Sequence, residues 1–288
     1  MEKEKMLNDL PDFQEKIYDK VISPIITINK SDIHDLYNNQ RGHFDKPESA
    51  QPCNINLLKS PFDEYKDSTV LGIDLPLWID WNDEKKQKLM IVGRDPQRNI
   101  NNVKKIEERL IIGSPYSLVS KGGRDAKNNY WSFIEPLIGK HRLYITDIYK
   151  LFIVNTNTEK VKELRALKEH YEIFINEINF ISPDKIITIG KDAADAVKKF
   201  ISANEKLSIK KIYEDLVYAV TDNETKRVIT VYFIPHISGQ VTSGVVTIAN
   251  LFKSIGMLRD DIELLSVGEE IIRLKDKLLY KKGEAENL

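Results

Sequence analysis

The stretch LMIVGRDPQRNI, residues 89–100, joins four apolar residues to a glycine and then to Arg94, Asp95 and Pro96. A short apolar run that ends at such residues is typical of a strand buried on both faces of a parallel sheet. The carboxylate of Asp95 follows the strand at once, and Pro96 fixes the backbone beside it. The stretch therefore predicts a buried strand with a charged group held at its carboxyl end.

Three more apolar runs have the same form, and helical patterns separate them. The runs are residues 143–146, 186–189 and 228–234. The clearest helical pattern covers residues 160–180, where apolar side chains recur on one face. Alternation of strands and helices at this spacing predicts a three-layer α/β/α domain over residues 81–258, with a central four-stranded parallel sheet.

The two ends of the chain do not follow this rhythm. Residues 1–80 contain polar, turn-rich stretches, and we interpret them as an N-terminal extension that packs on the core near the first strand. Residues 259–288 are highly charged, and Ser266 with Glu269 resembles a capping box that opens a helix. We expect this C-terminal helical tail to pack on the core, with a partner-binding helix as the alternative.

Composition argues against several classes of protein. The formal net charge of −1 argues against a polybasic coat for nucleic acid, although 43 Lys and Arg residues allow a local basic cleft. Cys53 is the single cysteine, so we expect no disulfide within the chain, no cysteine-based zinc site and no iron–sulfur cluster. No apolar run is long enough to span a membrane, and the charged N-terminus is not signal-like. These features predict a cytoplasmic protein without a metal or cofactor.

Polar side chains follow all four predicted strands. In a parallel sheet, ligands bind outside the carboxyl ends of the strands, and here those ends carry Asp95, Asp147, Lys191 and His236. Each of these residues alone has an ordinary structural explanation, such as a turn for an Asp before Pro. Their arrangement together predicts a catalytic site. The lack of a glycine-rich phosphate loop counts against a nucleotide-using enzyme.

Four blocks in order carry a resemblance to a known family. They are IVGRDP (91–96), LYITDIYK (143–150), KIITIGKDAADAV (185–197) and VYFIPHISG (231–239). The blocks resemble those of the uracil-DNA glycosylase superfamily: a water-activating loop, a strand with a base-reading residue, a strand–Gly–helix unit and a His-containing loop. The resemblance covers residues 89–244. It implies a DNA-binding, metal-independent glycosylase that flips out a base, hydrolyses its N-glycosidic bond with water and leaves an abasic site.

The resemblance also implies roles for single residues. Asp95 would stabilise positive charge on the sugar and orient the attacking water, as in other glycosyl transfers. His236 would donate a hydrogen bond to the departing base, and Ser238 would contact a phosphate. Tyr116 would stack on the extruded base, although a place in the core is the alternative for this residue.

Further contacts to DNA are expected from three segments. Gln240 or Val241 would be the wedge that helps to push the base out of the duplex, in a loop where Ile237 replaces the family's usual proline. The remaining candidates are Gly122, Gly123, Arg124 and Lys191. A solvated loop is the alternative reading of residues 122–124.

Two departures from the family fall in the expected base pocket. Gln97 stands where uracil-specific members have a tyrosine that blocks substituents at the pyrimidine 5-position, and Asp147 replaces the base-reading asparagine. An ionised Asp147 donates nothing to uracil O4, which costs about 1–3 kcal/mol, or roughly 5- to 150-fold against uracil. A carboxylate does accept the N4 amino group of cytosine, and a carboxyl protonated through burial also donates to N3.

These departures predict the target base. A 5-modified cytosine, hydroxymethylated or glucosylated as in some phage DNA, fits both changes and predicts an enzyme of anti-phage defence. A uracil-DNA glycosylase of base excision repair with a broadened pocket is one alternative. A non-catalytic nucleic-acid-binding or inhibitory protein on the same fold is another, and formation of an abasic product separates it from the enzymes.

Overall fold

The computed structural model describes most of the predicted domain. The described residues are 11–42, 51–67, 70–96, 109–126, 128–154, 157–200, 217–221 and 228–234. The predictions for Gln97, His236, Ser238, Gln240 and Val241 lie outside these residues, as does the predicted tail 259–288.

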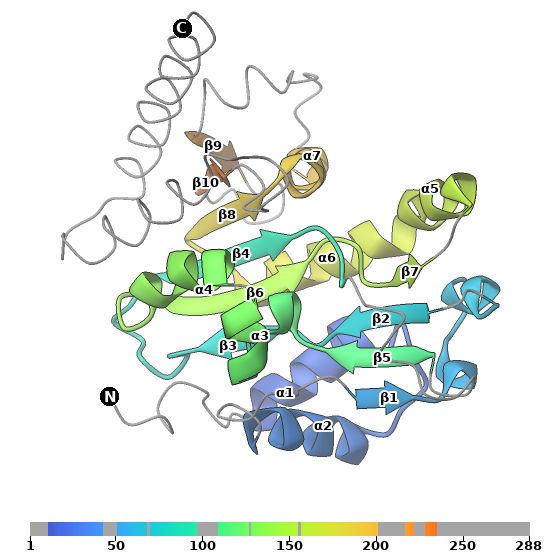
Figure 1. The fold of residues 1–288 in the computed structure, drawn as a ribbon. Coiled ribbons are helices and arrows are strands. Elements are labelled where there is room, and N and C mark those ends of the chain that lie inside the picture. Colours follow the sequence, from blue (N-terminus) through green and yellow to red (C-terminus); the bar gives the residue numbers. More distant parts are fainter. Residues whose placement is uncertain are drawn as a thin grey trace, which may run out of the picture.

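A six-stranded sheet contains all four predicted strands (Figure 1). Its order is β3 (Leu77–Ile79), β6 (Arg142–Asp147), β4 (Lys88–Gly93), β8 (Lys185–Ile189), β10 (Val228–Ile234) and β9 (Val217–Thr221). The four inner strands run parallel, whereas β3 and β9 are antiparallel to their neighbours. The prediction of a parallel sheet is therefore confirmed only in part, because the whole sheet is mixed.

Both faces of this sheet are covered, as its apolar strands require. Leu89 and Ile91 of β4 belong to one core cluster with α4 (Asn128–Ile134). Met90 and Val92 point to the opposite face and join a second cluster with α6 (Lys168–Ile181). Successive side chains of β4 thus point alternately into two separate core clusters. This gives the expected layering of helices, sheet and helices.

A second sheet was not predicted. It has the order β1 (Gln51–Cys53), β5 (Leu110–Gly113), β2 (Val70–Asp74) and β7 (Phe152–Val154), with β2 and β5 parallel and the other pairs antiparallel. Through β1, β2 and β3, the first 80 residues pair with β5, β6 and β7. These N-terminal residues therefore contribute strands to both sheets.

The remaining elements are helices. Besides α4 and α6, they are α1 (Pro11–Ile17), α2 (Lys30–Gly42), α3 (Lys121–Ala126), α5 (Thr158–Ala166) and α7 (Lys191–Phe200). Single turns of other helix types are Tyr18–Ile22, Ile55–Leu57, Phe62–Tyr65, Pro115–Ser117 and Glu135–Leu137. The helix predicted over residues 160–180 is divided into α5 and α6 at Leu167, whose backbone is extended (φ −56°, ψ 127°). Among the described helices, none is long and apolar enough to cross a membrane.

Candidate active site

The carboxyl ends of β4 and β6 bring two of the predicted site residues to one edge. Gly93, the last residue of β4, pairs in register with Asp147, the last residue of β6. The chains leaving these strands stay joined, because the amides of Ile148 and Tyr149 donate to the carbonyls of Gly93 and Arg94 at 3.0 and 2.9 Å. Asp95 and Asp147 therefore belong to one site.

Asp95 is held by two arginines. Its side chain is 4% exposed, and its Oδ2 accepts hydrogen bonds from Arg94 Nε at 3.0 Å and Arg165 Nη2 at 2.8 Å. Arg165 lies in the last turn of α5, 70 residues further along the chain, and no sequence signal pointed to it. The ion pair with Arg165 restricts rotation of the Asp95 side chain, which the short loop after β4 alone would not restrict.

Asp147 is buried at the end of β6. The residue is 4% exposed, and among the described residues its Oδ2 has no hydrogen-bond partner. Burial raises the pKa of this carboxyl well above its usual value, the neighbouring carboxyls of Asp74 and Asp95 raise it further, and Lys150 opposes them. A buried carboxyl with an unsatisfied oxygen is suited to bind a polar ligand edge.

Asp74 completes a carboxyl pair that the sequence analysis missed. It is the last residue of β2, in register with Gly113 of β5, and its carboxyl hydrogen-bonds with that of Asp147. The Asp74 carboxyl is one of the neighbours that raise the pKa of Asp147, because a second negative charge beside it disfavours the ionised form of Asp147. The signal was present in the stretch VLGIDLP (70–76), where a carboxylate again ends an apolar run shortly before a proline.

Tyr116 reaches the same place from the end of β5. Tyr116 and Ser117 have left-handed backbones (φ 54° and 57°), which costs about 1–3 kcal/mol for each non-glycine residue and is common at functional sites. The Tyr116 ring stacks on Tyr130 with centroids 4.3 Å apart. Burial and then the charge of Asp147 raise the pKa of its hydroxyl well above the usual value.

The side chains of Asp147 and Tyr116 both pack against Gly93. A Cβ at this position would lie 2.4 Å from Asp147 Oδ1 and 2.5 Å from the Tyr116 hydroxyl oxygen. Any larger residue would therefore displace the two side chains expected to hold the base. The close approach explains why a glycine ends this strand.

A model of the uracil DNA glycosylase superfamily matches residues 80–245, more than half of the 288 residues. The chain belongs to this superfamily. A search of curated proteins finds no match. Members of the superfamily are DNA glycosylases, hydrolases that act on DNA, and the match confirms the resemblance carried by the four sequence blocks.

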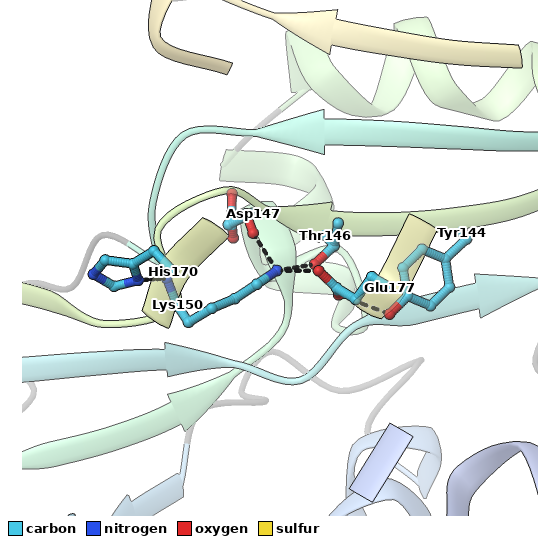
Figure 2. A network of polar contacts seen from close by, with 6 residues as sticks. All are labelled: Tyr144, Thr146, Asp147, Lys150, His170 and Glu177. Carbon is cyan, nitrogen blue, oxygen red and sulfur yellow. Dashed lines mark hydrogen bonds and ion pairs between the residues drawn. The ribbon is translucent and has the colours of Figure 1, made fainter. Parts of the chain in front are cut away.

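The carboxyl end of β6 is anchored by a buried polar network (Figure 2). Lys150 Nζ donates to the Glu177 carboxylate, to the backbone carbonyl of Asp147 and, at 2.9 Å, to the Thr146 hydroxyl. The hydroxyls of Tyr144 and Thr146 both donate to Glu177 Oε1, at 2.8 and 2.7 Å. The Lys150 and Glu177 side chains are 3% and 0% exposed. The network holds the backbone of Asp147 in place through the hydrogen bond from Lys150 to its carbonyl.

His170 supports the turn that follows. Its Nδ1 accepts the backbone amide of Lys150 at 2.8 Å. Burial, followed by the nearby Lys150 charge, lowers the pKa of His170 to about 3, so the imidazole is neutral near pH 7. A neutral ring is required here, because only an unprotonated Nδ1 accepts a hydrogen bond.

The predicted phosphate-contacting segment begins α3 and supports the Tyr116 loop. A Cβ at Gly123 would lie 1.9 Å from the backbone oxygen of Ser117. Arg124 is 9% exposed, donates to the Leu118 carbonyl at 2.9 Å and lies 5.1 Å from the Trp131 ring centre. These contacts give Gly123 and Arg124 a packing role, whereas contacts of residues 122–124 with phosphate stay a prediction.

Lys191 occupies the first position of α7, directly after Gly190, whose φ is 86°. This places it at the carboxyl end of β8, on the same edge of the sheet as the ends of β4 and β6. Its contact with DNA stays a prediction. Among the residues that the structure describes, no group of three or more His, Cys, Asp or Glu side chains is placed to hold a metal ion.

Proposed function

We propose that the protein is a DNA glycosylase that hydrolyses the N-glycosidic bond of a flipped-out pyrimidine and leaves an abasic site. The observation that carries the proposal is the buried Asp95 beside Asp147 at the carboxyl edge of β4 and β6, within the residues that match the superfamily. Water is the attacking group, so the enzyme is monofunctional.

The proposed mechanism uses charge held in place before the reaction. Cleavage of the glycosidic bond builds positive charge on the sugar, and the fixed Asp95 carboxylate stabilises that charge and orients the water. His236, which lies outside the described residues, stabilises the departing base. Tyr116 offers the ring face away from Tyr130 for stacking, and Asp147 binds the edge of the base.

The proposed base is a 5-modified cytosine of phage DNA, which would make the protein an enzyme of anti-phage defence. Asp147 supports this choice, because among the described residues its Oδ2 has no hydrogen-bond partner, and the N4 amino group of cytosine is a donor that a carboxylate accepts. Gln97 in place of a tyrosine supports a substituent at the 5-position. A hydroxymethyl or glucosyl group would extend into that space.

Uracil is the second candidate, and the raised pKa of Asp147 is compatible with it. A protonated carboxyl donates through its O–H and accepts through its C=O. This edge pairs with O4 and N3–H of uracil as well as with N3 and the amino group of cytosine. Discrimination against uracil therefore depends on ionisation of the Asp147 carboxyl.

Mass spectrometry of released bases tests the proposal. Duplexes carrying uracil, cytosine, 5-hydroxymethylcytosine or its glucosylated form are incubated with the protein, with Asp95→Ala as the inactive control. We expect release of the 5-modified cytosine and an abasic product. Release of uracil alone would support repair instead. Binding to DNA without any abasic product would identify a non-catalytic protein.

A further inference from the structure

The carboxylate of Asp95 has two positive partners on one oxygen. Arg94 Nε and Arg165 Nη2 both contact Oδ2, at 3.0 and 2.8 Å. Arg94 also lies 3.9 Å from Asp192 at the start of α7. Two guanidinium and two carboxylate groups therefore form a cluster whose formal charges cancel.

This pairing conflicts with the proposed role of Asp95. A carboxylate stabilises positive charge on the sugar through its own negative charge, and two adjacent guanidinium groups offset that charge. The interaction is strong because the Asp95 side chain is only 4% exposed and buried charges are poorly screened. Full electrostatic stabilisation of the sugar requires the arginines to find another partner when DNA binds.

DNA supplies such a partner in its phosphates. The arginine side chains are 37% and 31% exposed for Arg94 and Arg165, so both reach solvent while they contact Asp95. The Arg165 guanidinium lies 5.4 Å from the Tyr149 ring centre, and the Tyr149 amide donates to the Arg94 carbonyl. The two guanidinium groups are thus held near one another, and a guanidinium fork matches a phosphate in shape and charge.

We propose that Arg165 and Arg94 form a phosphate-binding pair that exchanges the Asp95 carboxylate for a backbone phosphate beside the flipped nucleotide. The inference rests on the proposed function and names the site where that function meets the DNA backbone. After the exchange, Asp95 lacks its cationic partners until positive charge develops on the sugar. Compared with a complex in which the arginines stay on Asp95, the exchange therefore stabilises the transition state more than the ground state and allows faster turnover.

Salt-dependent binding of Arg165→Gln tests the phosphate contact. Anisotropy of a fluorescein-labelled duplex that carries 5-hydroxymethylcytosine is measured over a range of NaCl concentrations. The slope of log K against log salt should become shallower by about 0.9, the value for one lost phosphate contact. Lys162→Gln is the matched control, because Lys162 is on the same helix but its side chain is 71% exposed and pairs with Glu159. An equal change in both variants would contradict a specific role for Arg165.

Steady-state kinetics separate phosphate binding from orientation of Asp95. In Arg165→Gln we expect KM for DNA to rise by about tenfold, with kcat within about twofold of wild type because Arg165 has left Asp95 in the complex. A large fall in kcat with an unchanged salt slope would overturn the proposal and leave Arg165 as an orienting residue.

Arg165→Lys keeps the test decisive should the glutamine variant fail to fold. It retains the charge but not the fork, so it should keep the salt slope and raise KM. A lower kcat at unchanged KM would overturn the proposal. Should wild type release no base while Arg165→Gln still shows the shallower slope, the proposed function fails and the phosphate contact stands.

Discussion

At the scale of single residues, the candidate site consists of charged groups that contact one another at the ends of strands. The position of Asp95 and Asp147 at one edge of the sheet could be predicted from the sequence, because each follows an apolar run, and parallel strands end at the edge where ligands bind. Their roles stay a prediction. Asp74 ends a similar run, but its strand belongs to a sheet that was not predicted. Arg165 gave no signal, because its contact with Asp95 joins positions 70 residues apart.

The choice of base is a residue-scale prediction. Asp147→Asn should shift preference from 5-modified cytosine towards uracil, because an amide donates to O4 without needing a proton. Gln97→Tyr should lower activity most on the largest 5-substituents, because a ring would fill the space beside them. Competition assays with mixed duplexes measure both effects. An efficient wild-type enzyme on uracil, with preference unchanged in Asp147→Asn, would contradict the cytosine assignment.

The raised pKa of Asp147 also predicts how stability changes with pH. The folded protein keeps a proton here that the unfolded chain releases above the ordinary carboxyl pKa of 3.8. Stability from this group is therefore fully present below 3.8 and is lost as pH rises towards the raised pKa of the folded state.

Urea unfolding between acidic and neutral pH checks this sign. Asp147→Asn has no proton to lose, so its free energy of unfolding should fall less over that range than that of wild type. Asp35→Asn, at an exposed position of α2, is the control and should follow wild type. Parallel curves for wild type and Asp147→Asn would show that the carboxyl titrates normally.

At the scale of elements, long apolar strands could be predicted and short mixed ones could not. The strands β4, β6, β8 and β10 are continuous apolar runs, whereas β1 is the three-residue QPC and β2 contains Gly72. Proline and glycine weaken a strand pattern, and pairing with β5 overrides that weakness. The end of the helix at Leu167 was likewise missed, because the apolar period continues through it.

The network between β6 and α6 gives a prediction about these elements. Lys150→Met leaves the Glu177 carboxylate buried without its cation, and we expect a loss of about 3–5 kcal/mol in the free energy of unfolding. The double variant Lys150→Met/Glu177→Gln removes both charges and keeps an oxygen to accept from Tyr144 and Thr146. It should be more stable than the single variant in urea unfolding. Equal stability of the two variants would mean that the unpaired Glu177 carboxylate carries no electrostatic cost.

At the scale of the whole molecule, the site lies where two sheets meet. The larger sheet supplies Asp95 and Asp147, and the smaller one supplies Asp74 and Tyr116 at the ends of β2 and β5. The residues that match the superfamily begin at 80, yet β1 and β2, which lie before this point, pair with β5 and β7, which lie after it. The family match therefore covers less than the unit that builds the site.

This arrangement predicts that a fragment of residues 81–288 does not fold as an active enzyme, although it contains nearly the entire family match. Its β5 and β7 would lose every strand partner that the structure describes, and β6 would lose its neighbour β3. Apolar strand edges left open in this way favour aggregation. Circular dichroism during heating should show no cooperative transition, and no base should be released.

Asp74→Asn in the full chain separates loss of the fold from loss of the carboxyl pair, because it should still melt cooperatively. A fragment that melts cooperatively and acts like wild type would show that the first 80 residues are a dispensable extension.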